Sequence, residues 1–254
     1  MMSPQLRQIA TKYCVAAYDK QTLFSQATAK ARWRMSIQAG ELTFSNNLTF
    51  PIQLLGVHDR TKREWWWTWG SGQNLPGNLL HSGFHLRQLG QRFHIPEFSS
   101  PWFSVAEDFE PITMLLACVG ACQQDAYFGM PDGPSVVYIL LKAPQVVVPD
   151  KDFAAVMSAW NSFWLTMSAG TDEKAALISY VRQQGYEAEV FEHYVRIVQP
   201  ATGNYVIART NDKGSVERVE PICTSTGIPL AEAEAKAVSS SPVKSLPKWW
   251  KLGK

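Results

Sequence analysis

Two histidines have the residue type and the spacing that acid–base or metal chemistry uses. His81 and His85 are four residues apart in a segment of helical periodicity, so their imidazoles lie on one face of the expected helix. Zinc-binding helices use this spacing, but the glutamate of the usual motif is missing between the two histidines, and no third ligand stands at a matching distance along the chain. The pattern favours a solvated helix face, and we expect no metal ligand.

The four cysteines, Cys14, Cys118, Cys122 and Cys223, include no C-x-x-C pair. Cys118 and Cys122 share one side of an expected apolar helix, which is typical of neutral thiols that pack as small hydrophobic groups. The sequence contains neither a G-x-S-x-G motif nor a glycine-rich phosphate loop. We therefore expect a non-enzymatic protein without catalytic residues or cofactors, and the cysteine usage indicates a cytoplasmic location.

A tryptophan-rich segment at residues 64–70 reads as a β-strand. Alternation along a strand places Trp65, Trp67 and Trp69 on one face and Trp66 on the other. Three indoles on one face predict core packing, because each buries a large apolar area. Trp66 is left as a candidate for a stacking surface, the alternative being a position beneath a helix.

Acidic residues gather in the segment at residues 186–199, where the apolar positions change parity between Val190 and Phe191. A β-bulge in a single strand reconciles this change and leaves Glu192 exposed beside Arg196. An acidic, exposed edge is a candidate docking patch for a basic partner, the alternative being a solvated face. The candidate partner-binding residues are Glu187, Glu189, Glu192, Arg196 and Trp66.

The composition excludes several classes of protein. With 254 residues, 46% of them hydrophobic and 18% charged, the chain is expected to be globular with one or two domains. The net charge of +2 is too small for a protein that binds nucleic acid directly. No apolar stretch reaches the roughly 18 to 20 residues of a membrane helix. The charge is uneven, at +2 for residues 1–149, −3 for residues 150–229 and +3 for residues 230–254.

The expected elements define the fold class. In a first domain at residues 1–148, a helix precedes a four-stranded antiparallel meander over residues 33–70, and two helices and a closing strand follow. A second domain at residues 149–228 contains two helices and three strands, and residues 229–254 form a basic tail. The fold class is α+β: an antiparallel sheet packed by helices, followed by a smaller α-α-β-β-β domain.

Residues 33–144 resemble a bacterial domain family of unknown function. The resemblance rests on the Phe-Pro-Ile-Gln-Leu-Leu-Gly run at residues 50–56, the Trp-Thr-Trp run at 67–69, the Leu-Arg-Gln-Leu-Gly run at 86–90 and the Asp-Ala-Tyr-Phe run at 125–128. The family implies no catalytic residues for this chain.

The two-domain layout resembles immunity proteins that neutralise nuclease toxins delivered by type VI secretion. This resemblance implies a small cytoplasmic protein that binds a cognate nuclease toxin and occludes its active site or DNA groove, without contact to nucleic acid or membrane. An acidic domain complements a basic groove electrostatically. The alternative is a small-molecule-binding protein or enzyme, with a pocket between the tryptophan strand and the helix of His81 and His85.

Overall fold

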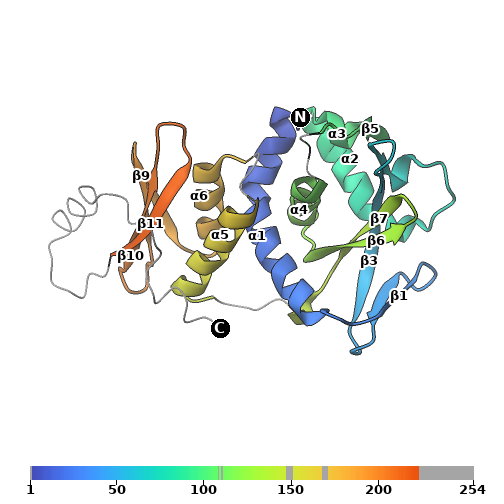
Figure 1. Ribbon diagram of the computed structural model, residues 1–254, viewed down its shortest axis with the longest axis horizontal. Helices are drawn as coiled ribbons and strands as arrows, with labels where there is room; N and C mark the ends of the chain where they lie inside the picture. The colour runs from blue at the N-terminus through green and yellow to red at the C-terminus, as the bar shows by residue number, and fades with distance from the viewer. Residues whose placement is uncertain (1, 108, 110, 147–150, 168–170, 223–254) are drawn as a thin grey trace. The chain divides into compact units, whose positions relative to one another are not determined.

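A computed structural model describes residues 2–107, 109, 111–146, 151–167 and 171–222. The chain divides into two compact units, residues 1–149 with 167–171 and residues 150–166 with 172–254. Figure 1 shows the elements of both units. Cys223 and the expected basic tail at residues 229–254 lie outside the described residues.

A seven-stranded antiparallel sheet forms the first unit's framework. Its strands are β1 (Trp33–Ser36), β2 (Glu41–Phe44), β3 (Thr49–Asp59), β4 (Glu64–Trp67), β5 (Trp102–Ser104), β6 (Ala126–Asp132) and β7 (Ser135–Leu141). The order is β1-β2-β3-β4-β5, and β7 pairs with both β3 and β6. The first half of β3 pairs with β2 and its second half with β4, which lets the sheet curl. The expected α+β class is confirmed, although β5 was not predicted.

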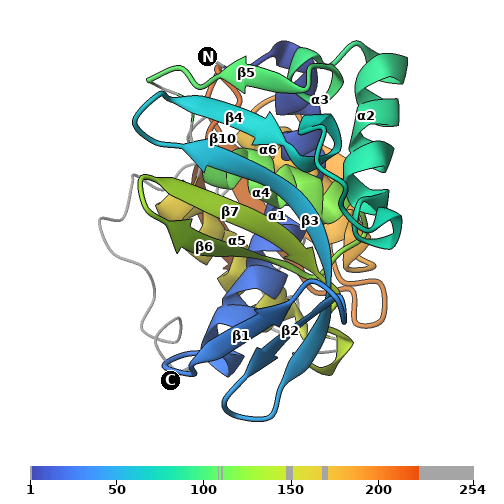
Figure 2. The ribbon, with the colours of Figure 1, turned by 90° about the vertical axis from the view of Figure 1, so that its right-hand side faces the viewer.

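Helices cover one side of this sheet, as Figures 1 and 2 show for α1 and α4. The first unit's helices are α1 (Pro4–Ala27), α2 (His81–Phe93), α3 (Pro96–Ser99) and α4 (Pro111–Ala121), with short 3-10 turns η1 (Thr68–Gly70), η2 (Gly77–Leu79) and η3 (Pro144–Val146). Gly120 lets α4 approach α1, because a Cβ there would overlap the side chain of Tyr13. Buried Glu97 accepts 2.7 Å hydrogen bonds from the backbone N–H and the hydroxyl of Ser3, which anchors the start of α1.

Burial alternates along the tryptophan strand as predicted for its first three indoles. Trp65 and Trp67 are 0% exposed, whereas Trp66, on the other face, is 40% exposed. The prediction that Trp69 continues the buried face is wrong, because β4 ends at Trp67 and Trp69 lies in η1. There the guanidinium of Arg87 lies 4.8 Å from the Trp69 ring centroid.

The second unit combines two helices with a four-stranded antiparallel sheet. Its elements are α5 (Phe153–Met167), α6 (Glu173–Gln183), β8 (Glu187–Val190), β9 (Tyr194–Val198), β10 (Tyr205–Thr210) and β11 (Val216–Ile222). The sheet order is β11-β10-β9-β8, so the strands form a simple meander with β8 at one edge. Three strands were predicted; the fourth arises because residues 187–198 form a hairpin.

Candidate functional site

The β8–β9 hairpin holds four of the five partner-binding residues that the sequence suggests. The single bulged strand expected over residues 186–199 is wrong, because the chain reverses after Val190 and pairs with itself. The change of apolar parity marks this reversal. The turn at residues 191–193 contains no glycine, asparagine or proline and is held from outside, since Lys174 Nζ donates hydrogen bonds of 2.9 and 3.2 Å to two of its carbonyls.

Arg196 is engaged inside the hairpin. It forms an ion pair with Glu189, which lies opposite it in the β8–β9 register. Its guanidinium also lies 5.9 Å from the ring centroid of Phe191 and 5.8 Å from that of Tyr205. The charge of Glu189 is therefore neutralised within the chain.

The remaining hairpin residues form an exposed patch. Val190 is 54% exposed and Phe191 39% exposed, and the Phe191 ring stacks on Tyr194 with centroids 4.4 Å apart. Glu187 and Glu192 are exposed on either side of these two apolar residues along the chain. We call Glu187, Val190, Phe191 and Glu192 the hairpin surface. Its apolar centre is Val190 and Phe191, and its charged rim is Glu187 and Glu192, with Glu187 on the face of β8 opposite to Val190. This combination of residue types is found in protein interfaces.

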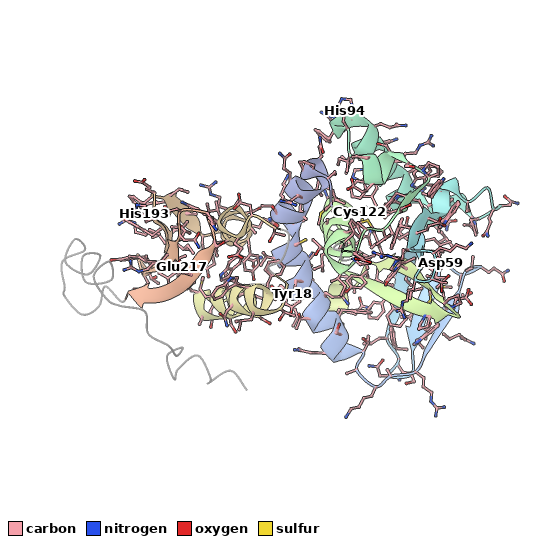
Figure 3. The ribbon with its side chains drawn as sticks, turned by 45° about the horizontal axis from the view of Figure 1, so that its top comes forward. Tyr18, Asp59, His94, Cys122, His193 and Glu217 are labelled. Carbon is pink, nitrogen blue, oxygen red and sulfur yellow. The ribbon has the colours of Figure 1, made fainter. Side chains whose placement is uncertain are left out.

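Charged side chains modify the edge of this sheet. Arg182 Nη2 donates a 3.1 Å hydrogen bond to the carbonyl of Ala188, and so covers part of the β8 edge. The two ring nitrogens of His193, labelled in Figure 3, lie 3.8 Å from the carboxylates of Glu192 and Asp212. A covered edge resists indiscriminate strand pairing, so recognition at this hairpin depends on its side chains.

Trp66, the fifth candidate, lies in the first unit. Its ring stacks on Trp102 of β5, with centroids 5.6 Å apart and an interplanar angle of 21°. Its indole N–H donates a 3.1 Å hydrogen bond to Glu64 Oε2. The sequence does not predict Trp102 as its neighbour, because the three-residue strand of Trp102 lies far from β4 in the chain and has no alternating pattern of its own.

A cavity of about 320 Å³ lies beside the histidine pair. Its lining includes His81 and His85 of α2, Gln53 of β3, and residues 122–124 that follow α4. Tryptophan is not among the described residues that line it, in contrast to the expected pocket. Trp69 packs instead against Gly83 of α2, where a Cβ would lie 3.1 Å from Trp69 Cδ1.

Most polar groups in the cavity wall are already bonded. Gln53 Oε1 accepts the backbone N–H of Ser82 at 3.1 Å, and Gln53 Nε2 donates to the carbonyls of Ile52 and Asn78. Burial raises the pKa of Cys122, labelled in Figure 3, to about 12, and outweighs the opposing effect of its hydrogen bond to Ser82. Within the described chain, the two imidazoles have no hydrogen bond or ion pair, so they are the groups open to a ligand.

The thiols of Cys14 and Cys118 are equally inert. Burial raises the pKa of Cys14 to about 12, and burial together with the neighbouring Cys122 and Cys14 raises the pKa of Cys118 well above its ordinary value. The predicted burial of Cys118 is confirmed. Among the described residues, no three His, Cys, Asp or Glu side chains are grouped so that they could hold a metal ion. The described helices include none with the length and apolar character of a membrane span.

A model of the family of unknown function DUF6882 matches residues 7–144, which is more than half of the chain. The chain belongs to this family. The resemblance predicted for residues 33–144 is thus confirmed, and the DUF6882 region also takes in most of α1. Trp66, Trp102 and the histidine cavity lie inside the DUF6882 region, and the hairpin surface lies outside it. Searches of the curated proteins and of the solved structures found no match.

Proposed function

We propose that this protein is an immunity protein, which binds a cognate secreted nuclease toxin of the type VI kind in the cytoplasm and occludes its active site or DNA groove. The observation that carries the proposal is the hairpin surface, where two exposed apolar residues are flanked along the chain by two exposed glutamates. Such a patch is suited to protein binding. The proposed activity is inhibition by contact, with no chemistry of the protein's own.

Two physical effects support a basic partner. Burial of Val190 and Phe191 beneath a partner contributes roughly 1 to 3 kcal/mol for each side chain. Residues 150–229 carry a net charge of −3, and an acidic surface accelerates association with the basic groove of a nuclease. The apolar centre thus supplies affinity, and the acidic rim supplies orientation and rate.

Co-expression tests the proposal directly. The full chain is produced together with the nuclease encoded beside its gene; growth is rescued and the two proteins purify as a complex. A chain that neither rescues growth nor forms a complex overturns the function. This experiment does not depend on knowing which residues form the interface.

Two double variants test the hairpin surface. Val190→Ser with Phe191→Ser weakens the complex about 10- to 100-fold in calorimetry, because it removes the apolar centre. Glu187→Lys with Glu192→Lys slows association about tenfold at low salt. Leu165→Ser and Glu217→Lys are the matched controls, since both residues are exposed in the same unit. Wild-type affinity in both double variants would place the interface elsewhere.

A second candidate function is the binding of a small molecule in the histidine cavity. It is favoured by one observation, that both unpartnered imidazoles line the same cavity of about 320 Å³. Thermal-shift screening with small carboxylates and phosphate esters tests it, because histidine binds such anions best when protonated. Stabilisation by such a ligand is expected to be lost in the double variant His81→Ala with His85→Ala. It is expected to be kept in His94→Asn, because asparagine tolerates the left-handed backbone conformation of residue 94. A screen without any hit removes this candidate.

A further inference from the structure

One face of the first unit's sheet carries an apolar row beside an acidic row. Residues paired across antiparallel strands, and residues two apart along a strand, point to the same side of a sheet. The apolar row, read from β5 to β6, is Trp102, Trp66, Val57, Val137 and Met130. The adjacent row is Ser104, Glu64, Asp59, Ser135 and Asp132. We call these residues, without the buried Met130, the acidic-aromatic face.

This face is opposite to the one that buries Trp65 and Trp67, and in Figure 2 the sheet lies in front of α1 and α4. Trp66 is 40% exposed and Trp102 44% exposed, so two large apolar rings meet solvent side by side. Adjacent exposed indoles are uncommon on a protein surface unless they bind something. The hydrogen bond from Trp66 to Glu64 fixes the indole beside a carboxylate.

The acidic row has no basic partner within the described residues. Neither Glu64 nor Asp132 forms an ion pair there, and Asp59, labelled in Figure 3, accepts backbone N–H groups of its own turn. Of the cations in the turn at residues 60–63, Arg63 forms a 2.9 Å ion pair with Glu107, whereas Arg60 and Lys62 form no ion pair with the acidic row among the described residues.

Among the residues that the structure describes, no cation lies over the aromatic row. Elsewhere in the described chain, Arg87 lies over Trp69 and Arg92 over Phe93, at 4.8 and 5.2 Å from the ring centroids. No such contact occurs at Trp66 or Trp102 among the described residues. Two partly exposed indoles, with Glu64 and Asp59 in the adjacent row and Asp132 further along it, form an environment that attracts a cation, and a planar guanidinium most of all.

We propose that the acidic-aromatic face binds an extended polypeptide segment that presents arginine or lysine side chains. The acidic row crosses five strands, a span of roughly 19 Å at about 4.8 Å per strand spacing, which matches five or six residues of extended chain. The apolar row beside it is accessible only from Trp102 to Val137, because Met130 is buried in the core. A single small cation would occupy only the tryptophan end. The partner's cationic side chains stack on Trp66 and Trp102 and pair with Glu64, Asp59 and Asp132.

This inference does not rest on the proposed function. The acidic-aromatic face belongs to the DUF6882 region, whereas the hairpin surface lies outside it. A variant of the hairpin surface therefore keeps the binding described here. Loss of toxin binding and loss of basic-segment binding are separable outcomes.

A hexaarginine peptide is the probe, and the full-length chain is the protein tested. Calorimetry at low salt is expected to show binding that weakens as salt increases, and hexacitrulline, which has nearly the same shape without the charge, is expected not to bind. Trp66→Leu with Trp102→Leu, and separately Glu64→Gln with Asp132→Asn, each lower the affinity about tenfold. Trp33→Leu with Glu41→Gln is the matched control, because both residues are exposed in the same unit.

Three results would overturn the proposal: no binding of hexaarginine to the wild-type chain, equal binding of hexacitrulline, or wild-type affinity in both face variants. Thermal unfolding of each variant separates loss of binding from loss of fold. Should the tryptophan variant unfold, the carboxamide variant still decides the question. It replaces two partly or fully exposed carboxylates by groups of the same size.

Discussion

The two units each expose a stacked aromatic pair beside carboxylates. They differ in whether an arginine of the same chain lies over the rings and neutralises a carboxylate. Trp66 and Trp102 stack at 5.6 Å in the first unit, and Phe191 and Tyr194 stack at 4.4 Å in the second. At the second pair, Arg196 covers Phe191 and neutralises Glu189. At the first pair, no cation of the described chain plays this part.

The comparison shows that composition alone does not decide what a surface binds. Both pairs combine aromatic rings with glutamates, but the internal arginine leaves the hairpin with mainly apolar binding capacity in Val190 and Phe191. The acidic-aromatic face keeps its charge and its π faces available. We therefore expect binding at the hairpin to depend on apolar burial, and binding at the sheet face to depend on salt.

The largest expected effect separates structural from exposed tryptophans in one strand. Trp67→Ala destabilises the protein by about 3 to 5 kcal/mol, because it opens a cavity in a core where Trp67 is 0% exposed. Trp66→Leu costs less than about 1 kcal/mol, since a large part of its surface already meets water. Urea unfolding measures both. A cost for Trp66→Leu as large as that for Trp67→Ala would make Trp66 a structural residue.

A second prediction compares a paired carboxylate with an unpaired one. Asp125 is buried and forms ion pairs with Lys20 at 3.0 Å and Lys142 at 3.5 Å, and it accepts the Ala143 N–H at 2.9 Å. Asp125→Asn is expected to cost about 2 kcal/mol at pH 7, because it weakens charge-assisted hydrogen bonds. Asp132→Asn is expected to stay within about 0.5 kcal/mol. Equal costs would mean that Asp132 has a structural role.

The carboxyl group of Asp125 also makes the cost of Asp125→Asn dependent on pH. Burial alone would raise the pKa of Asp125, but the Ala143 N–H and the two lysines outweigh burial and hold the pKa below its usual range. Its stabilisation is therefore present above the unfolded-state pKa of about 4 and is lost as the pH falls through the lower folded-state value. The free energies of unfolding of the wild type and of Asp125→Asn should differ at pH 7 and should become equal in strong acid. If the free energies of unfolding of the two proteins differ by the same amount at both pH values, the cost of Asp125→Asn comes from packing.

Local patterns predicted the strands and helices well and the contacts between distant segments poorly. The two-residue alternation identified the burial of Trp65 and Trp67, and helical spacing brought His81 and His85 to one cavity. The stacking of Trp66 on Trp102 depends on pairing between strands 36 residues apart, and β5 is too short for a pattern. The sequence therefore suggested Trp66 as a surface residue and gave no sign of its neighbour.

The hairpin was missed for a related reason. Its turn has none of the residues that favour reversal, and Lys174 of α6 supplies the hydrogen bonds that hold it. The alternation of apolar positions in the sequence shifts by one residue after Val190, but a bulge within one strand and a turn between two strands produce the same shift. Only the partner of Glu189 distinguishes them, and that partner is Arg196 across the hairpin.

The smallest effect tests the comparison itself. The side chains of Arg196 and Glu189 are 20% and 42% exposed, so solvent screens their ion pair, and Arg196→Gln is expected to cost only about 1 kcal/mol. The variant also frees Glu189 and uncovers Phe191, which gives the hairpin the charge pattern of the acidic-aromatic face. Calorimetry should then detect a second, weaker site for hexaarginine.

The control for this last experiment is Glu189→Gln combined with Arg196→Gln, which removes the cation and the carboxylate together and should restore a single peptide site. If Arg196→Gln alone gains no second site, coverage by an internal cation is not what distinguishes the two pairs. The difference would then lie in the rings, because the indole has a stronger π face for a cation than the phenyl ring. Phe191→Trp in the Arg196→Gln background separates these two explanations.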